Sequence, residues 1–208
     1  NPNGETASYL DEVRRNERLN KGYNGNVGFE WYVTPSISWT NIFSYRKNNG
    51  ENPDRVTQKF YNPAFDLQKL SNRFNDQMSN SENMDYSTNF MKKFETDGHT
   101  LSVDASYSFN KDNDDSQIFS NSSDYVNNTE SNTLQRTDNI QRQKRVLFQA
   151  DYVLPIAEKY RFEAGYRLNI NDLTTDYGVE DFAGGTWSNN AEFTNALQYK
   201  EQVNAVYT

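Results

Sequence analysis

Apolar and polar residues alternate with a period of two along much of this chain, and this pattern constrains its fold more than any other feature. Successive side chains of a β-strand point to opposite faces of a sheet, so the pattern predicts strands with one apolar and one polar face. The clearest set is Leu101, Val103, Ala105, Tyr107 and Phe109, which alternates with serine and aspartate. We expect about seven such strands, over residues 22–33, 36–46, 86–94, 101–109, 145–152, 160–168 and 197–207.

The segments that connect these strands alternate in length. Short turns are expected near 34–36, 96–99 and 154–159, where proline or an Asp-Gly pair favours a turn. Long polar loops are expected near 47–83, 110–141 and 171–195, and residues 1–21 should be the end of another polar loop. Strict alternation of short turns and long loops is typical of membrane β-barrels, whose turns are short on one side and long on the other.

The composition favours the same architecture. Only 34% of the residues are hydrophobic, which is too few for a large two-sided core, yet 14% are aromatic, including 14 tyrosines and 13 phenylalanines. A barrel with a thin apolar exterior and a polar interior needs few aliphatic residues but many aromatic ones at the membrane interfaces. No apolar run approaches the roughly 18 residues of a membrane-spanning helix.

These observations predict an all-β fold: an antiparallel up-and-down meander of about seven strands over residues 22–208, forming part of a transmembrane β-barrel. An odd number of strands would leave an open sheet edge, which lipid does not tolerate, so we expect a segment of a larger barrel. A soluble or surface-exposed β-sandwich that binds glycan or protein through aromatic loops remains the alternative, because one wet face and one dry face produce the same alternation.

Several classes of function are disfavoured. The net charge of −8 argues against nucleic-acid binding, and the absence of cysteine excludes thiolate metal sites. His99 is the only histidine and lies in an expected turn, so neither a three-histidine zinc site nor a Ser-His-Asp triad is predicted. The run Asp112–Asp115 lacks the spacing of a calcium loop and is interpreted as a solvated acidic turn. We therefore expect no enzyme, no metal and no cofactor.

Two groups of residues are candidates for function. Charged residues on the polar sides of the strands should face the barrel lumen, where they would pair with one another, line a solute path or hold a plug; these are Glu30, Asp151, Arg161, Glu163 and Arg167. Trp187, beside Gly184 and Gly185 in an expected loop, is the candidate for contact with a ligand, although a tryptophan there also serves to anchor a loop. Trp31, Trp39 and Tyr45 lie on regular strands and are expected in an interfacial girdle.

Four segments resemble the barrel of TonB-dependent receptors, the outer-membrane β-barrel family of receptors with a carboxypeptidase-regulatory-like extension. They are residues 93–102 (KFETDGHTLS), 151–156 (DYVLPI), 162–167 (FEAGYR) and 198–207 (QYKEQVNAVY). Their order and spacing carry the resemblance, which covers roughly residues 22–208.

The resemblance implies an outer-membrane location and a role in the binding and uptake of a nutrient. In that family a plug domain fills a 22-stranded lumen, and TonB supplies energy from the inner membrane. This sequence shows no plug and no TonB box, and it has too few strands for the whole barrel. The expected partners are therefore outer-membrane lipid, and a plug domain, TonB and a nutrient through the full-length protein.

Overall fold

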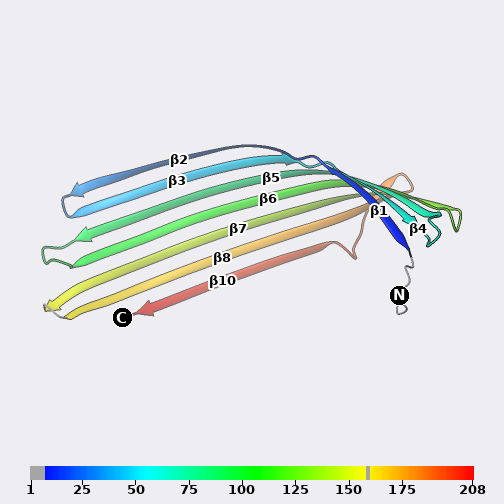
Figure 1. Ribbon diagram of the computed structural model, residues 1–208. Coiled ribbons are helices and arrows are strands. Elements are labelled where there is room, and N and C mark those ends of the chain that lie inside the picture. Colours follow the sequence, from blue (N-terminus) through cyan, green and yellow to red (C-terminus); the bar gives the residue numbers. More distant parts are fainter. Residues whose placement is uncertain (1–7, 158–159) are drawn as a thin grey trace.

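The computed structural model describes residues 8–157 and 160–208, which form one antiparallel sheet (Figure 1). Its strands are β1 (Tyr9–Asn16), β2 (Leu19–Thr34), β3 (Ile37–Glu51), β4 (Asp54–Tyr61), β5 (Leu67–Lys93), β6 (Thr100–Asp124), β7 (Thr129–Ala157), β8 (Tyr160–Ala183), β9 (Thr186–Asn189) and β10 (Asn195–Tyr207). Among the described residues no helix is long and apolar enough to span a membrane.

Seven strands lie side by side in chain order, β2, β3, β5, β6, β7, β8 and β10, each antiparallel to the next. The prediction of an all-β antiparallel meander of about seven strands is confirmed. The other strands continue the sheet beyond one end of these seven: β1 pairs with β4, β4 pairs with the first half of β5, and β9 pairs with the end of β8.

The connections at the two ends of the sheet differ. The turns from β2 to β3 and from β5 to β6 lie at one end, where β7 also ends and β8 begins (Figure 1). The tips at residues 62–66, 125–128 and 184–185 lie at the other. Of the expected turn at 154–159, residues 154–157 belong to β7, and residues 158–159 fall outside the described part. We call the first end the short-turn end and the second the hairpin end.

The segments expected to be long loops are instead β-strands. Residues 47–83 contain the end of β3, all of β4 and the first half of β5, and residues 110–141 contain the end of β6 and the start of β7. Most of 171–195 belongs to β8 and β9, and β1 and the start of β2 occupy the described part of 1–21. These segments are polar on both faces, which removes the alternation that identifies a strand, but the backbone ladder does not need an apolar face.

The strands are much longer than a bilayer requires. β7 has 29 residues and β6 has 25. At about 3.3 Å per residue, β7 is roughly 95 Å long, whereas a tilted strand crosses the hydrocarbon in about 9–11 residues. More than half of each long strand therefore lies outside the hydrocarbon, in the hairpins.

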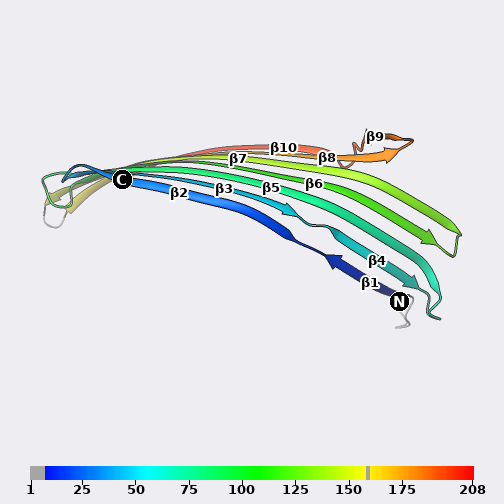
Figure 2. The ribbon, with the colours of Figure 1, turned by 90° about the horizontal axis from the view of Figure 1, so that it is seen from above.

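The sheet is a single curved layer (Figure 2). Among the described residues, Val179 (5% exposed) is the only buried hydrophobic side chain and Asn41 (6%) the only buried polar or charged one. The predicted alternative, a β-sandwich, is wrong for this structure, because no second sheet packs against the first in the described part and aromatic residues such as Phe29 and Trp31 remain more than half exposed.

Candidate functional site

The register of the strands defines two faces of the sheet. On one, which we call the apolar face, three successive rows of paired residues are almost wholly hydrophobic. They are Trp31-Trp39-Phe90-Val103-Ala150-Tyr166-Val206, Phe29-Asn41-Thr88-Ala105-Phe148-Leu168-Asn204 and Val27-Phe43-Tyr86-Tyr107-Val146-Ile170-Gln202. Aromatic and aliphatic groups exposed on a single-layer sheet require an apolar solvent, which the hydrocarbon of a bilayer provides.

The apolar face has a defined height. On β6 it runs from Leu101 to Phe109, and the next residue on the same face is Lys111, which lies in a row with Lys47, Glu82 and Arg142. The apolar stretch of nine residues matches the roughly 9–11 residues that cross a bilayer. On β7 and β8 the first charged residues on this face, Lys144 and Asp172, already lie in the row of Phe109, so the strands enter water between this row and the row of Lys111 on the side of the hairpins.

Several polar groups within the apolar face are hydrogen-bonded to one another. The indole nitrogen of Trp39 donates to the Thr88 hydroxyl (2.7 Å), and the Tyr86 hydroxyl donates to the Asn41 side-chain oxygen (2.7 Å). An unpaired polar group costs several kcal/mol in hydrocarbon, so these bonds lower the cost of placing Trp39, Tyr86 and Thr88 on the apolar face, whereas the side-chain nitrogen of Asn41 has no hydrogen-bond partner among the described residues.

The opposite, polar face carries all five charged residues predicted to face the lumen, but it does not gather them into one site. Arg161 and Glu163 form an ion pair on β8, and Arg167 lies further along the same strand. Glu30 lies far across the sheet on β2, where the Tyr32 hydroxyl donates to it (2.7 Å). Asp151 accepts from Gln149 (2.8 Å). The five residues share a face and line a wall, and their role in a lumen remains a prediction.

The last strand is oriented differently from the others. The sequence places Tyr207 and the alternate residues back to Leu197 in an apolar set, but the register puts this set on the polar face of the sheet. The Tyr207 ring covers Gly165, where an added Cβ would lie 2.2 Å from the ring, and its hydroxyl donates to Asp151. Glycine at 165 makes room for this ring, and the contact ties β10 to β8 and β7.

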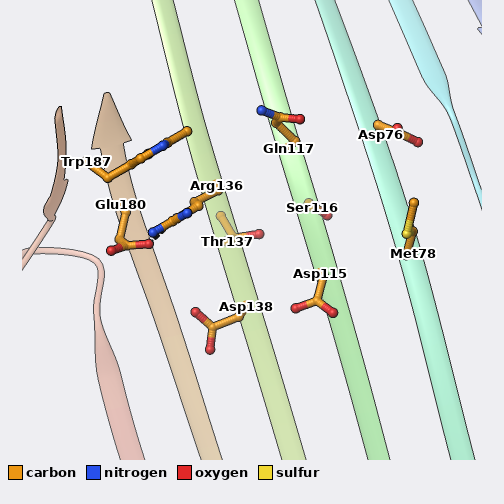
Figure 3. A pocket seen from close by; sticks show the side chains of 10 residues that line it. All are labelled: Asp76, Met78, Asp115, Ser116, Gln117, Arg136, Thr137, Asp138, Glu180 and Trp187. Atoms are coloured by element: carbon orange, nitrogen blue, oxygen red, sulfur yellow. Dashed lines mark hydrogen bonds and ion pairs between the residues drawn. The ribbon is translucent and has the colours of Figure 1, made fainter. Parts of the chain in front are cut away.

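Trp187 lies in an open hollow of about 590 Å³ at the hairpin end (Figure 3). The Gly184-Gly185 turn between β8 and β9, with φ angles of 60° and 83° that favour glycine, returns the chain so that Trp187 pairs with Phe182. The Arg136 guanidinium lies 4.6 Å from the Trp187 ring centroid and pairs with Glu180. The stacked, paired arginine fixes the indole as one wall of the hollow.

Carboxylates line another part of this hollow, together with Met78, Ser116, Gln117 and Thr137. Asp115 lies directly opposite Asp138, and Asp76 occupies the neighbouring row (Figure 3). The hydrogen bond from Arg136 lowers the pKa of the Glu180 carboxyl, with burial acting against it, so Glu180 stays charged below its ordinary range. In the described part of the chain, no group of three or more histidine, cysteine, aspartate or glutamate side chains is placed to hold a metal ion.

The run Asp112–Asp115 is not a turn but part of β6, so its side chains alternate between the two faces. Burial, followed by the nearby charges of Asp112 and Asp115, raises the pKa of Asp114. Sequence analysis identified Trp187 but missed its partners Arg136 and Glu180, because both lie in segments that the polar sequence predicts to be loops. The charge pattern offers no signal for this pairing without the register of β7 and β8.

Trp187 lies on the same side of the sheet as the apolar face. Its partner Phe182 has the same parity on β8 as Glu180, which pairs with Arg136, and as Leu168 and Tyr166 of the apolar face. The hollow is therefore on the side that meets lipid lower down, above the charged row that bounds the apolar stretch.

Comparison with known proteins agrees with this geometry. No curated protein matches the chain. A family model described as "Outer membrane protein beta-barrel family" matches residues 92–208, which include the end of β5 and all of β6 to β10. The chain belongs to the outer membrane protein β-barrel family, and its location is the outer membrane.

Proposed function

We propose that the chain is part of the barrel wall of a TonB-dependent receptor, which binds a nutrient outside the cell and takes it up. The observation that carries the proposal is the great length of the strands on one side of the apolar stretch. Because external connections are the long ones in barrels of this kind, the hairpin end is the external end. A tall external wall suits capture of a solute before it enters the lumen. The resemblance of residues 93–102, 151–156, 162–167 and 198–207 to such receptors supports the same function.

The polar face supplies the chemistry that a lumen requires. On β2 to β8 polar and charged residues predominate on it, as in the row Glu30-Thr40-Asn89-Asp104-Gln149-Arg167, where Asn89 donates to Asp104 (2.7 Å). Such a face can contact water, a solute or a plug domain. In the proposed receptor, outer-membrane lipid contacts the apolar face, while the plug, TonB and the nutrient act through the full-length protein. The proposal gives the chain no catalytic role and no nucleic-acid partner.

The position of Trp187 refines its predicted role. A solute that moves along the polar face meets Tyr177, which is 38% exposed there, whereas Trp187 lies on the other side of the sheet. We therefore expect Tyr177→Ala to weaken capture of the nutrient more than Trp187→Ala does. Weaker binding by Trp187→Ala than by Tyr177→Ala, measured with whichever probe the wild-type protein takes up, would instead support Trp187 as the ligand contact.

Uptake by the full-length protein tests the proposal. Cells that express it receive labelled probes too large for passive entry: a maltooligosaccharide, cyanocobalamin and a ferric siderophore. We expect at least one probe to accumulate only when both the protein and a functional TonB are present. Accumulation that is unchanged without TonB would indicate a passive pore, and no accumulation of any probe would also count against the receptor.

A further inference from the structure

A lysine interrupts the apolar face next to the short-turn end. Lys92 lies in the row Ile37-Lys92-Leu101-Tyr152-Ala164, directly below the three hydrophobic rows. In these four rows, all of whose residues the structure describes, it is the only charged side chain. A charge on the lipid-facing side is tolerated at the edge of the hydrocarbon, where a long side chain reaches the headgroups.

Aromatic contacts fix the surroundings of Lys92. Its ammonium nitrogen lies 4.7 Å from the centroid of the Phe94 ring, and that ring stacks on His99 with centroids 3.9 Å apart. The His99 ring nitrogen Nε2 lies 2.8 Å from the Tyr152 hydroxyl, which connects the turn to β7. The backbone N–H of Lys93 donates to the Ser36 carbonyl (2.8 Å), which joins this turn to the one before β3. These contacts therefore hold the Lys92 side chain in a defined position.

An open hollow of about 500 Å³ lies at this point. Lys92, Lys93, Ser36, Thr96 and His99 line it and offer hydrogen-bond donors, and Glu95 is the one acidic residue in its lining. Neither lysine forms an ion pair with any residue that the structure describes. Lys92 lies on the apolar side of the sheet, whereas Lys93, the next residue of β5, pairs with Thr100 on the opposite side, so Lys92 supplies the ammonium group that faces lipid and lacks an anion.

We infer that this hollow holds the phosphate of an anionic phospholipid from the leaflet beside the short turns. Lysine binds phosphate as a point charge, and Lys92 stands where the hydrocarbon ends and the headgroups begin. The acyl chains of the same lipid would lie against Ile37 and Leu101, so burial of hydrocarbon adds to the charge attraction. Short turns are periplasmic in barrels of this kind, so the lipid belongs to the periplasmic leaflet.

Lipid retention by the full-length protein tests this site. The protein is placed in nanodiscs of phosphatidylethanolamine, with or without phosphatidylglycerol, and the bound lipid is counted by native mass spectrometry. We expect preferential retention of phosphatidylglycerol, reduced about fivefold by Lys92→Gln and clearly less by Lys93→Gln, because Lys93 lies on the other side of the sheet. Lys92→Arg keeps the charge and should retain the lipid, whereas Glu95→Gln removes the opposing charge and should increase retention.

Lys111→Gln is the matched control, because Lys111 lies on the same face at the other end of the apolar stretch. It should leave retention unchanged. Equal retention by the wild-type protein and the Lys92→Gln variant would overturn the inference, as would an equal loss with Lys111→Gln. Soluble glycerol phosphate should not displace the lipid; if it displaces it fully, the site is one for free phosphate instead.

Discussion

Leu168→Arg is expected to destabilise the folded full-length barrel by about 2–4 kcal/mol, which is the penalty for a cation on the lipid face near the middle of a bilayer. Leu168 lies on β8 in the second hydrophobic row, beside Phe148 of β7. Its side chain cannot avoid the hydrocarbon there, since the headgroups are several residues away in either direction. Denaturant unfolding in lipid vesicles, followed by the heat-modifiable shift in gel mobility, measures the loss.

Asn169→Arg is the matched control for this prediction. Asn169 is the next residue on β8 and points to the polar face, where it pairs with Leu147 and Val203. The same substitution should change the free energy of unfolding by less than about 1 kcal/mol, because the new charge stays in water. Equal destabilisation by the two variants would show that the faces are assigned wrongly.

Val103→Pro is expected to reduce the free energy of unfolding by several kcal/mol, which is the cost of an unpaired backbone group in hydrocarbon. β6 is paired on both sides, with Val103 between Phe90 of β5 and Ala150 of β7, so proline removes one hydrogen bond from the ladder. The carbonyl that loses its donor lies in hydrocarbon, where no water can replace it. The full-length protein with this change should fail to show the heat-modifiable shift in most of its population.

Ser122→Pro makes the corresponding change near the external tip. Ser122 is also paired on both sides, with Ser71 and Ser131, but water surrounds both faces of the sheet at this height. Water can donate a hydrogen bond to the freed carbonyl, so the free energy of unfolding should fall clearly less than for Val103→Pro. If the two variants lose equal stability in the same vesicles, then the boundary between membrane and hairpin is not where the apolar stretch ends.

The membrane-crossing parts of the strands could be predicted from sequence because two solvents act on them. Hydrocarbon on one side and water on the other select alternate residues, as in Leu101 to Phe109, and this alternation locates strands even without a core. The hairpins could not be found in this way. With water on both sides, residues such as Asn121 and Asn132, bonded to each other at 2.6 Å, leave no periodic signal.

The sequence also could not predict which face of the sheet the apolar residues of β10 occupy. Its alternation is clear, but alternation says only that two faces differ, and a shift of one residue in register exchanges them. In the structure, Val206 pairs with Tyr166 and Tyr207 covers Gly165, which turns the apolar residues of β10 to the polar face. Only the cross-strand pairing decides between the two orientations.

The candidate site residues could be predicted only where their position depends on a single strand. The five charged residues were assigned to one face because strand parity is a local property, and the register places them on one face. The surroundings of Trp187 depend on Arg136 and Glu180, which come from two long strands that were expected to be loops. A site built by distant strands requires the register between them, which no single segment encodes.

Cysteine accessibility along β7 tests the central claim, a lipid-facing stretch continued by a water-exposed hairpin, most directly. The chain has no cysteine, so single cysteines can be placed between residues 131 and 153 of the full-length protein in a cysteine-free background. On intact cells, a membrane-impermeant maleimide should label both alternate sets from 131 to 142, and it should leave positions 146, 148, 150 and 152 unlabelled. Labelling of those four positions, or protection of the whole hairpin, would contradict this account.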